Sequence, residues 1–388
     1  MDGRQGRWTP VVVAGGYLLL TLVLLWPAAP HFTTHLIGDG GDTYQFAWNL
    51  WWTRHALVDL HTTPFLTQAL HHPGGVSLWL HTLSPWNGLL SIPLQAVFSL
   101  EVTYNLIVVL SFVLSGLGAF YLARHLTGGT AGPFVAGLVY TFSSYHFAHA
   151  LGHLNLVACQ WLPFVALYAL RTLEVGGWRN GAMCGLAFAC NALCESYYTV
   201  YALLLLPMLL ALRWRRPTRP VLVGAATAVA TALAGCGWFV AGMLRAARAE
   251  DFVGAHPPDV FSADLLGYVV PNRISSWGRL TESLWSRWTG NATENACFLG
   301  FAVIALVVVA VWKVRASRPF AAMAAFFLLL SLGQHLHVGG ERTRIPLFYL
   351  VLERHVPFFD VMGVPARFDV MVELCVSVMV AFALRRLA

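Results

Sequence analysis

The sequence predicts an all-α membrane protein, a single-domain bundle (residues 1–388) of about ten transmembrane helices. Its composition supports this, since 57% of its 388 residues are hydrophobic and only 11% are charged, whereas an average soluble domain is about 25% charged. The apolar residues also form long uninterrupted runs, of which 11–29 and 221–244 are the clearest. Because a bilayer span needs about 20 such residues, these runs are expected to cross a membrane.

The expected spans follow from the apolar runs taken in order. They are 11–29, 104–122, 134–150, 154–170, 181–212 (a hairpin of two helices that turns near Glu195), 221–244, 298–312, 321–336 and 364–384. The first run is longer than the hydrophobic region of a typical signal peptide and is interpreted as a retained span. Segment 84–100 is apolar but contains Pro85 and Pro93, so it is expected to lie against the membrane. If it spans instead, the next three crossings are inverted.

Basic residues in short loops indicate the cytoplasmic side. They include Arg4, Arg7, Arg124, Arg171, Arg179, Arg213, Arg216, Arg219, Lys313, Arg315, Arg318, Arg385 and Arg386. One topology places all of them inside, with a cytoplasmic N-terminus and two long external loops at about 30–103 and 245–296. Most carboxylates then lie outside, so an active site is expected at the external face of a bacterial or archaeal cytoplasmic membrane. Nucleic acid is not expected as a partner, because the formal charge of +6 is thinly spread.

The first external loop contains a pair of carboxylates among glycines, Gly38-Asp39-Gly-Gly-Asp42. Glycine lets a backbone approach a ligand closely, and paired carboxylates suit a divalent cation such as Mg²⁺ or Mn²⁺ or a general base. Asp39 and Asp42 are therefore the candidate catalytic residues and metal ligands. The alternative is that Asp42 caps the following helix. That helix contains three tryptophans, Trp48, Trp51 and Trp52, and is expected to be an external helix beside the membrane.

Further candidate substrate-binding residues lie beyond this pair. In the same loop they are His72, before a Pro-Gly-Gly turn, and Trp86 with Asn87. His72 has the alternative of being a solvated loop residue. His146, His149 and His153 are spaced i, i+3 and i+7, which places them on one face of a helix, where they would contact phosphate or transfer a proton, or be tolerated at the interface.

Four more candidates are Glu195, Tyr198, Glu294 and Arg367. Glu195 and Tyr198 lie at the hairpin tip in an apolar stretch of the chain, and a carboxylate there needs a partner, either one of the histidines or Arg367. Glu294 precedes a span and either faces the site or caps that helix. Arg367 begins the last span, where it would bind phosphate or pair with Asp369 or Glu373.

These motifs together resemble the polytopic GT-C glycosyltransferase superfamily, in particular its YfhO-like bacterial and archaeal branch. The residues that carry the resemblance, in order, are Gly38-Asp39, Trp48-Asn-Leu-Trp51-Trp52, His72-Pro-Gly-Gly, Tyr104-Asn105-Leu, Ser111-Phe-Val-Leu-Ser-Gly-Leu-Gly, Ser144-Tyr145, His153-Leu-Asn, Trp161-Leu-Pro163, Asp264-Leu-Leu, Pro271, Glu294, Phe298-Leu-Gly and Pro365-Ala-Arg367-Phe. Each piece is weakly specific, and the ordered set along nearly the whole chain is more so.

The resemblance implies an enzyme that takes a sugar from a polyprenyl-phosphate-linked donor and transfers it, at the external face, to a glycan, lipid or protein acceptor. In that superfamily an acidic residue of the first external loop is the base or metal ligand, and Asp39 and Asp42 match it. Relatives commonly continue into further spans and a soluble domain, which is not expected here because the sequence stops just after Arg386. The competing classes are a transporter or flippase of a polyprenyl-linked lipid and a non-catalytic membrane scaffold.

Overall fold

The computed structural model describes residues 5–213, 216–249, 256–356, 359 and 362–388, with side chains from residue 10 onward. Arg4 of the basic positions therefore lies outside the described residues. The contacts divide the chain into two compact units. Unit 1 comprises Met1–Gly118 and Ala150–Phe252, and unit 2 comprises Ala119–His149 and Val253–Ala388.

Unit 1 is built mainly of helices. They are α1 (Gln5–Leu24), η1 (Trp26–His31), α2 (Asp42–Arg54), η2 (His55–Asp59), α3 (Pro85–Gln95), most of α4 (Leu100–Thr127), α7 (Leu154–Val157), α8 (Trp161–Glu174), α9 (Trp178–Cys194), α10 (Ser196–Leu212) and α11 (Arg219–Ala249). The first long loop adds one small antiparallel sheet of β1 (Leu66–Thr67) and β2 (Val76–Ser77), with Leu66 opposite Ser77.

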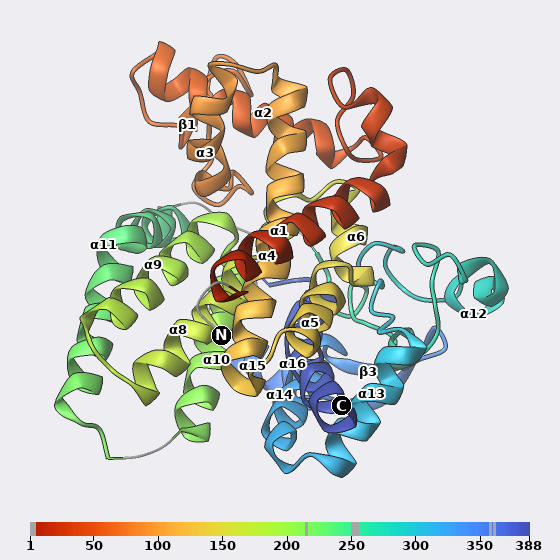
Figure 1. The fold of residues 1–388 in the computed structure, drawn as a ribbon. Helices are drawn as coiled ribbons and strands as arrows, with labels where there is room; N and C mark the ends of the chain where they lie inside the picture. Colours follow the sequence, from red (N-terminus) through yellow and green to blue (C-terminus); the bar gives the residue numbers. More distant parts are fainter. Residues whose placement is uncertain (1–4, 214–215, 250–255, 357–358, 360–361) are drawn as a thin grey trace. The chain divides into compact units, whose positions relative to one another are not determined.

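Helices α9 and α11 lie side by side along much of their length (Figure 1). Glycines allow this close approach. A Cβ at Gly181 would meet the carbonyl oxygen of Gly224 at 2.0 Å, and one at Gly185 would meet that of Ala228 at 2.3 Å. Small residues at the contact let helix backbones pack closely in membrane proteins, where no hydrophobic effect drives helices together.

An aromatic cluster attaches the first long loop to α9 and α11. The rings of Phe65 and Trp79 stack with their centroids 3.9 Å apart, and Phe239 of α11 lies 5.9 Å from Phe65. Trp52 of α2 belongs to the same buried cluster, and its indole nitrogen donates to the Pro64 carbonyl. Aromatic burial of this kind is a large source of stability, and it holds the loop against these helices.

His81, in the same loop and outside the membrane-spanning helices, carries a testable pH dependence. Burial lowers its pKa from 6.5, and its Nδ1 has no hydrogen-bond partner among the described residues. As pH falls below 6.5 the unfolded chain binds this proton and the folded chain does not, so stability decreases. We expect the loss in thermal midpoint between about pH 7.5 and 5.5 to be smaller in His81→Gln than in the wild type. Exposed His31→Gln should behave like the wild type, and equal losses in all three would contradict the expectation.

Asn105 of α4 fixes the start of the first loop. Its side-chain oxygen accepts from the backbone nitrogen of Ile37 at 2.7 Å. Its amide nitrogen donates to the carbonyls of Phe32 and His35, both at 2.8 Å. The Asn105 side chain is fully buried, its bond from Ile37 is buried and its two bonds to carbonyls are partly buried, and together they hold the loop to a long apolar helix.

Removing this side chain should destabilise the protein. We expect Asn105→Leu to lower the free energy of unfolding by about 2–4 kcal/mol, because the buried Ile37 N–H and two carbonyls lose their partner. Asn180→Leu is the comparison, since Asn180 makes a single bond, to the Gly176 carbonyl. Unfolding in detergent measures both, and a loss at Asn105 no larger than that at Asn180 would contradict the expectation.

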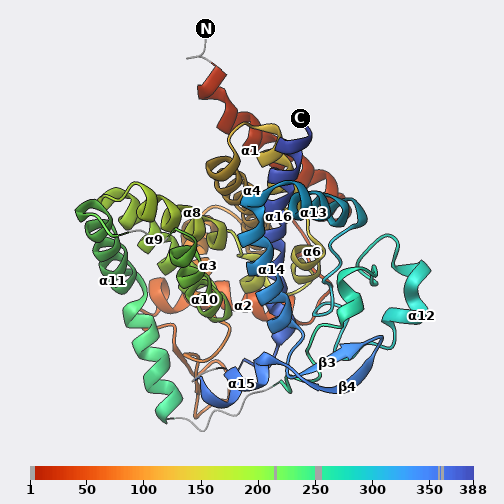
Figure 2. The same cartoon turned by 90° about the horizontal axis from the view of Figure 1, so that it is seen from below.

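Unit 2 contains the remaining elements. They are α5 (Ala131–Thr141), α6 (Ser144–Ala150), η3 (Leu265–Tyr268), η4 (Gly278–Thr281), α12 (Glu282–Trp285), α13 (Phe301–Lys313), η5 (Arg315–Ser317), α14 (Arg318–Ser331), β3 (His335–Val338), β4 (Glu341–Pro346), α15 (Phe348–His355), η6 (Pro365–Phe368) and α16 (Asp369–Leu387). Helix α16 is buried from residue 369 to 383 and packs against α5, α13 and α14 (Figure 2). Strands β3 and β4 form an antiparallel hairpin in which His337 faces Arg342.

The predicted helical bundle is confirmed in outline and corrected in detail. In the described residues three helices are long and apolar enough to span a membrane, at Leu100–Thr127, Leu154–Glu174 and Arg219–Ala249. Shorter apolar helices occupy four other predicted runs: Pro10–Leu24, Ala131–Thr141, Ser196–Leu212 and Phe301–Lys313. The hairpin turn near Glu195 is confirmed, because α9 ends at Cys194 and α10 begins at Ser196.

Two predicted spans are interrupted. Run 134–150 divides into α5 and α6 because Ser143 accepts from the backbone nitrogen of His146 and starts a new helix. Run 321–336 leaves the helix after Ser331 and enters β3. The two small sheets, β1–β2 and β3–β4, are a departure from the all-α prediction in a chain that is otherwise mainly helical. Segment 84–100 forms α3 and the first residue of α4, and its relation to the membrane stays a prediction.

Candidate functional site

A carboxylate–histidine pair lies at the start of α2 in unit 1. The Nε2 atom of His153 lies 3.1 Å from Oδ2 of Asp42. The Asp42 side chain is 59% exposed and the His153 side chain 19%, so the carboxylate is open to an incoming molecule while the imidazole is largely covered. A carboxylate that contacts an imidazole nitrogen fixes the orientation of the ring, as in many proton-transferring sites.

The backbone brings these two distant segments together. The backbone nitrogen of Asp39 donates to the carbonyl of Leu151 at 2.8 Å, and the Thr43 hydroxyl donates to the same carbonyl at 3.1 Å. Gly38 has φ +154°, and a Cβ there would meet the Thr43 hydroxyl oxygen at 2.2 Å. A glycine is therefore required at position 38 for the close approach of this segment to Thr43 and Leu151.

Asp42 does not cap its own helix. Gly41 occupies the N-cap position of α2, no side chain caps this end, and Asp42 is the first helical residue. The alternative of a capping aspartate is thus wrong. Asp39 is exposed, and its carboxylate has no hydrogen bond or ion pair within the described part of the chain. Both carboxylates are therefore available for chemistry.

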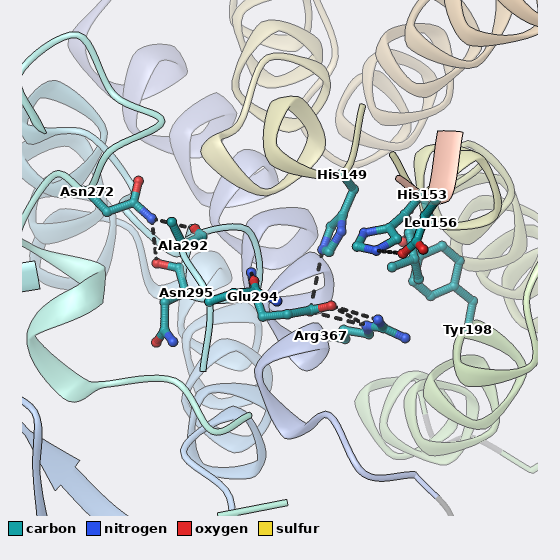
Figure 3. Close-up of polar contacts among 11 residues, drawn as sticks. His149, His153, Leu156, Tyr198, Asn272, Ala292, Glu294, Asn295 and Arg367 are labelled. Atoms are coloured by element: carbon teal, nitrogen blue, oxygen red, sulfur yellow. Dashed lines mark hydrogen bonds and ion pairs between the residues drawn. The ribbon is translucent and has the colours of Figure 1, made fainter. Parts of the chain in front are cut away.

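Glu195 finds its partner in Asn155. The Asn155 amide nitrogen donates to Oε2 of Glu195, and Oε1 accepts from the backbone nitrogen of Tyr197 at 3.0 Å and so caps α10. The predicted partners of Glu195, a histidine or Arg367, were wrong. The fold brings the turn after His153, which carries Asn155, to the hairpin tip, and the sequence alone does not show this contact. Tyr198 is buried and donates to the Leu156 carbonyl at 2.6 Å (Figure 3).

Trp86 and Asn87 lie against the same turn. The Asn87 amide nitrogen donates to the Leu154 carbonyl at 3.4 Å and to the Ser84 hydroxyl at 3.0 Å. The Trp86 ring meets the ring of Trp161 edge to face at 5.4 Å. Unit 1 thus gathers most of its candidate residues around the segment that begins at His153. His72 differs, since it is exposed in the β1–β2 connection, as expected for a solvated loop histidine.

Unit 2 contains a separate ion pair between Glu294 and Arg367 (Figure 3). The Glu294 carboxylate accepts from Arg367 Nη2 at 2.6 Å and from Nε at 3.2 Å. The two side chains are only 3% and 11% exposed. Nε2 of His149 lies 3.9 Å from the same carboxylate. Arg367 therefore pairs with Glu294 and not with Asp369 or Glu373, and Glu294 does not cap α13, whose N-cap is Gly300.

The three histidines do not share one helix face. Helix α6 ends at Ala150, and His153 stands at the N-cap position of α7. His146 is buried and its Nδ1 lies 2.8 Å from the Thr141 carbonyl. The i, i+3, i+7 argument assumed an unbroken helix, but Gly152 and a new helix start interrupt it.

Asp39 and Asp42 are compatible with a divalent cation. Mg²⁺ is typically bound by one or two carboxylates, with water and substrate phosphate completing its shell, and both carboxylates are exposed. Within the described residues these two do not belong to a set of three histidine, cysteine or acidic side chains with ligand atoms within 4.8 Å of one another. A cation would therefore depend on water and phosphate oxygens for its remaining ligands.

Sequence reasoning missed two residues that build the site. Asn155 and Asn105 each appear in a motif of the family resemblance, yet neither was proposed as a site residue. Both are buried amides in apolar segments. A buried amide needs partners, and that requirement is the signal that would have found them.

Among the described residues the fold is mainly helical, with three helices long and apolar enough to span a membrane. A cryo-EM structure of the arabinofuranosyltransferase AftD from mycobacteria matches 98% of this chain with a TM-score of 0.60 and 16% sequence identity. The match covers 24% of that chain, so the present chain spans about a quarter of the length of this neighbour. At 16% sequence identity this likeness shows a shared fold and does not by itself show a shared activity.

The family is shown by sequence. A family model described as a domain of unknown function (DUF6311) matches residues 11–387, and the chain belongs to this family. A search of curated proteins gave no match.

Proposed function

We propose that the protein is a membrane glycosyltransferase, akin to the YfhO-like branch, that transfers a sugar from a polyprenyl-phosphate-linked donor to an acceptor at the external face. The observation that carries the proposal is the pairing of Asp42 with His153 at 3.1 Å. The likeness of the fold to an arabinofuranosyltransferase supports the same class of reaction. The acceptor is a glycan, lipid or protein.

Asp42 is proposed as the general base. The acceptor hydroxyl oxygen forms a bond to the anomeric carbon of the donor sugar, and the bond from that carbon to the phosphate oxygen breaks. Its electron pair leaves with polyprenyl phosphate, and the hydroxyl proton passes to the Asp42 carboxylate. His153 orients that carboxylate and, when protonated, offsets negative charge near the departing phosphate.

Asp39 and Asp42 are the proposed ligands of a Mg²⁺ or Mn²⁺ ion. When bound, such an ion would neutralise charge on the phosphate. Asn155 and Glu195 then position the turn after His153, and Trp86 with Asn87 lie against the same segment. His72 remains a proposed phosphate contact.

Glu294 and Arg367 are assigned a positioning role in unit 2. The Nε and Nη2 atoms of Arg367 already donate to the Glu294 carboxylate, so the guanidinium has less capacity to bind phosphate than the sequence suggested. The pair connects the segment before α13 to the start of α16.

Transfer is tested in liposomes that contain the purified protein, a polyprenyl-phosphate-linked pentose or hexose, and a cell-envelope acceptor fraction. Free polyprenyl phosphate and glycosylated acceptor should appear together. A parallel sample with a chelator tests the cation, and should lose activity that added Mg²⁺ or Mn²⁺ restores. Intact donor that reaches the opposite leaflet, with no free polyprenyl phosphate, would instead support a flippase. Neither product nor movement would support a scaffold.

A further inference from the structure

A hollow in unit 2 lies beside the Glu294–Arg367 pair and has no role in the proposed chemistry. Its cavity volume is about 140 Å³, and further space beside it is open to solvent. This is smaller than the range of about 300 to 1,000 Å³ that is common for drug-sized ligands, so the hollow can enclose only part of a ligand of that size. Its walls come from the segment that includes α12 and from the turn that carries Glu294, because Asn291 and Asn295 both line it.

The walls are fixed by their own hydrogen bonds. Asn272 donates from its amide nitrogen to the carbonyls of Ala292 and Asn295, both at 2.9 Å (Figure 3). Asn295 donates to the Thr289 carbonyl at 2.6 Å, and the Trp285 indole nitrogen donates to the Gly278 carbonyl at 2.7 Å. A hollow whose walls are already bonded needs little rearrangement to accept a ligand.

Several polar groups around the hollow remain unused. The indole nitrogen of Trp288 is buried and has no hydrogen-bond partner among the described residues. The hydroxyls of the exposed Ser286 and the part-exposed Thr289 also make no hydrogen bond within that part of the chain, but of these three groups only the Trp288 N–H is buried. The side-chain oxygen of Asn291 accepts from the Glu294 backbone nitrogen at 2.9 Å, which leaves its amide nitrogen available. Buried polar groups are nearly always paired, so unpaired ones at a hollow indicate a ligand.

The chemistry of the lining selects the class of ligand. None of the lining residues is charged, so an anion such as a phosphate has no counter-charge there. Two indoles, Trp285 and Trp288, offer flat apolar faces with polar edges, and the unused groups include both donors and acceptors. A neutral molecule with several hydroxyls and an apolar C–H face matches this combination.

We propose that this hollow binds a neutral saccharide, the glycan part of the acceptor. That the saccharide belongs to the acceptor rests on the proposed transferase function. The binding of a saccharide in this hollow does not depend on that function. The turn Asn291–Asn295 links the hollow to Glu294, so a bound glycan would lie next to the ion pair that fixes this turn to the start of α16.

Binding is measured directly, without transfer. The full-length protein in detergent is applied to an array of neutral pentose and hexose oligosaccharides, and the strongest binder is titrated in solution by tryptophan fluorescence. Trp288→Phe keeps the ring and removes its N–H, and the double variant Ser286→Ala/Thr289→Val removes two hydroxyls. Each should weaken binding about tenfold, as expected when about 1.4 kcal/mol of hydrogen bonding is lost.

Matched controls lie in the same segment. Ser283→Ala and Trp277→Ala alter exposed residues outside the hollow and should bind like the wild type. The double variant keeps the test valid if Trp288→Phe fails to fold. No binding to any oligosaccharide, or equal losses in variants and controls, would overturn the proposal. Binding without transfer would refute the transferase alone, and transfer with unaffected hollow variants would refute the saccharide site alone.

Discussion

Asp42→Asn should lower the rate of sugar transfer about 10²–10⁴-fold, the usual contribution of general acid–base catalysis. The asparagine keeps the shape of the side chain but cannot take the acceptor proton. The amount of folded protein should not change, because the Asp42 side chain is 59% exposed. The rate of free polyprenyl phosphate release measures the effect, and the thermal midpoint in detergent reports folding.

Asp59→Asn is the matched control. Asp59 is another exposed aspartate of unit 1, paired with His55 at 2.9 Å and with Arg54 at 3.3 Å. Hydrogen bonding to His55 lowers the pKa of Asp59, so it too is a carboxylate beside an imidazole, but outside the candidate site. Its substitution should leave transfer unchanged. Full activity in Asp42→Asn, or an equal loss in Asp59→Asn, would refute Asp42 as the base.

Arg367→Met should destabilise the protein by about 3–5 kcal/mol, because it leaves the buried Glu294 carboxylate without its cation. The comparison is Arg213→Met, which breaks an ion pair with Glu174 of the same 2.6 Å N–O distance. That pair is 36% and 30% exposed, so its loss should cost less than about 1 kcal/mol. Unfolding in detergent gives both values. Similar losses in the two variants would show that burial of Glu294 does not decide the effect.

A double variant separates the charge from the packing. Glu294→Leu combined with Arg367→Met removes both charges, and replacing a buried ion pair by apolar residues is often neutral or stabilising. We expect the double variant to recover most of the stability lost by Arg367→Met. A double variant as unstable as the single one would mean that hydrogen-bond geometry, and not the unpaired charge, accounts for the loss.

Local sequence signals predicted the positions of most helices. The hairpin turn at Glu195 followed from one carboxylate in a long apolar run, and the structure ends α9 there. The extent of helices was less predictable, since the run 134–150 was taken as one span, whereas Ser143 starts a separate helix, α6, within it. Short helices and two hairpins occupy segments where composition alone indicates a span or a loop.

Partners of the buried polar residues could not be predicted, because they depend on which distant segments meet. Glu195 was matched in the sequence with cations, yet Asn155 bonds to it, since a buried carboxylate is satisfied by donors of any charge. Arg367 pairs with Glu294 across 73 positions of sequence instead of with a carboxylate on its own helix. The glycines of residues 38–42 were expected to allow the approach of a ligand, and in the structure Gly38 allows the close approach of the Leu151 carbonyl; ligand binding there stays a prediction.

The three hydrogen bonds of Asn105 have a consequence for how the proposed site is held before binding. They anchor residues 32–37 to a long helix, and the bond from Asp39 to Leu151 fixes the other side of the same segment. In the proposed reaction the backbone that carries the carboxylates would therefore be in place before a donor binds, and little loop entropy would be lost. A single residue inserted between Asp39 and Asp42 would shift Asp42 relative to His153 while the bonds of Ile37 and Asp39 remained.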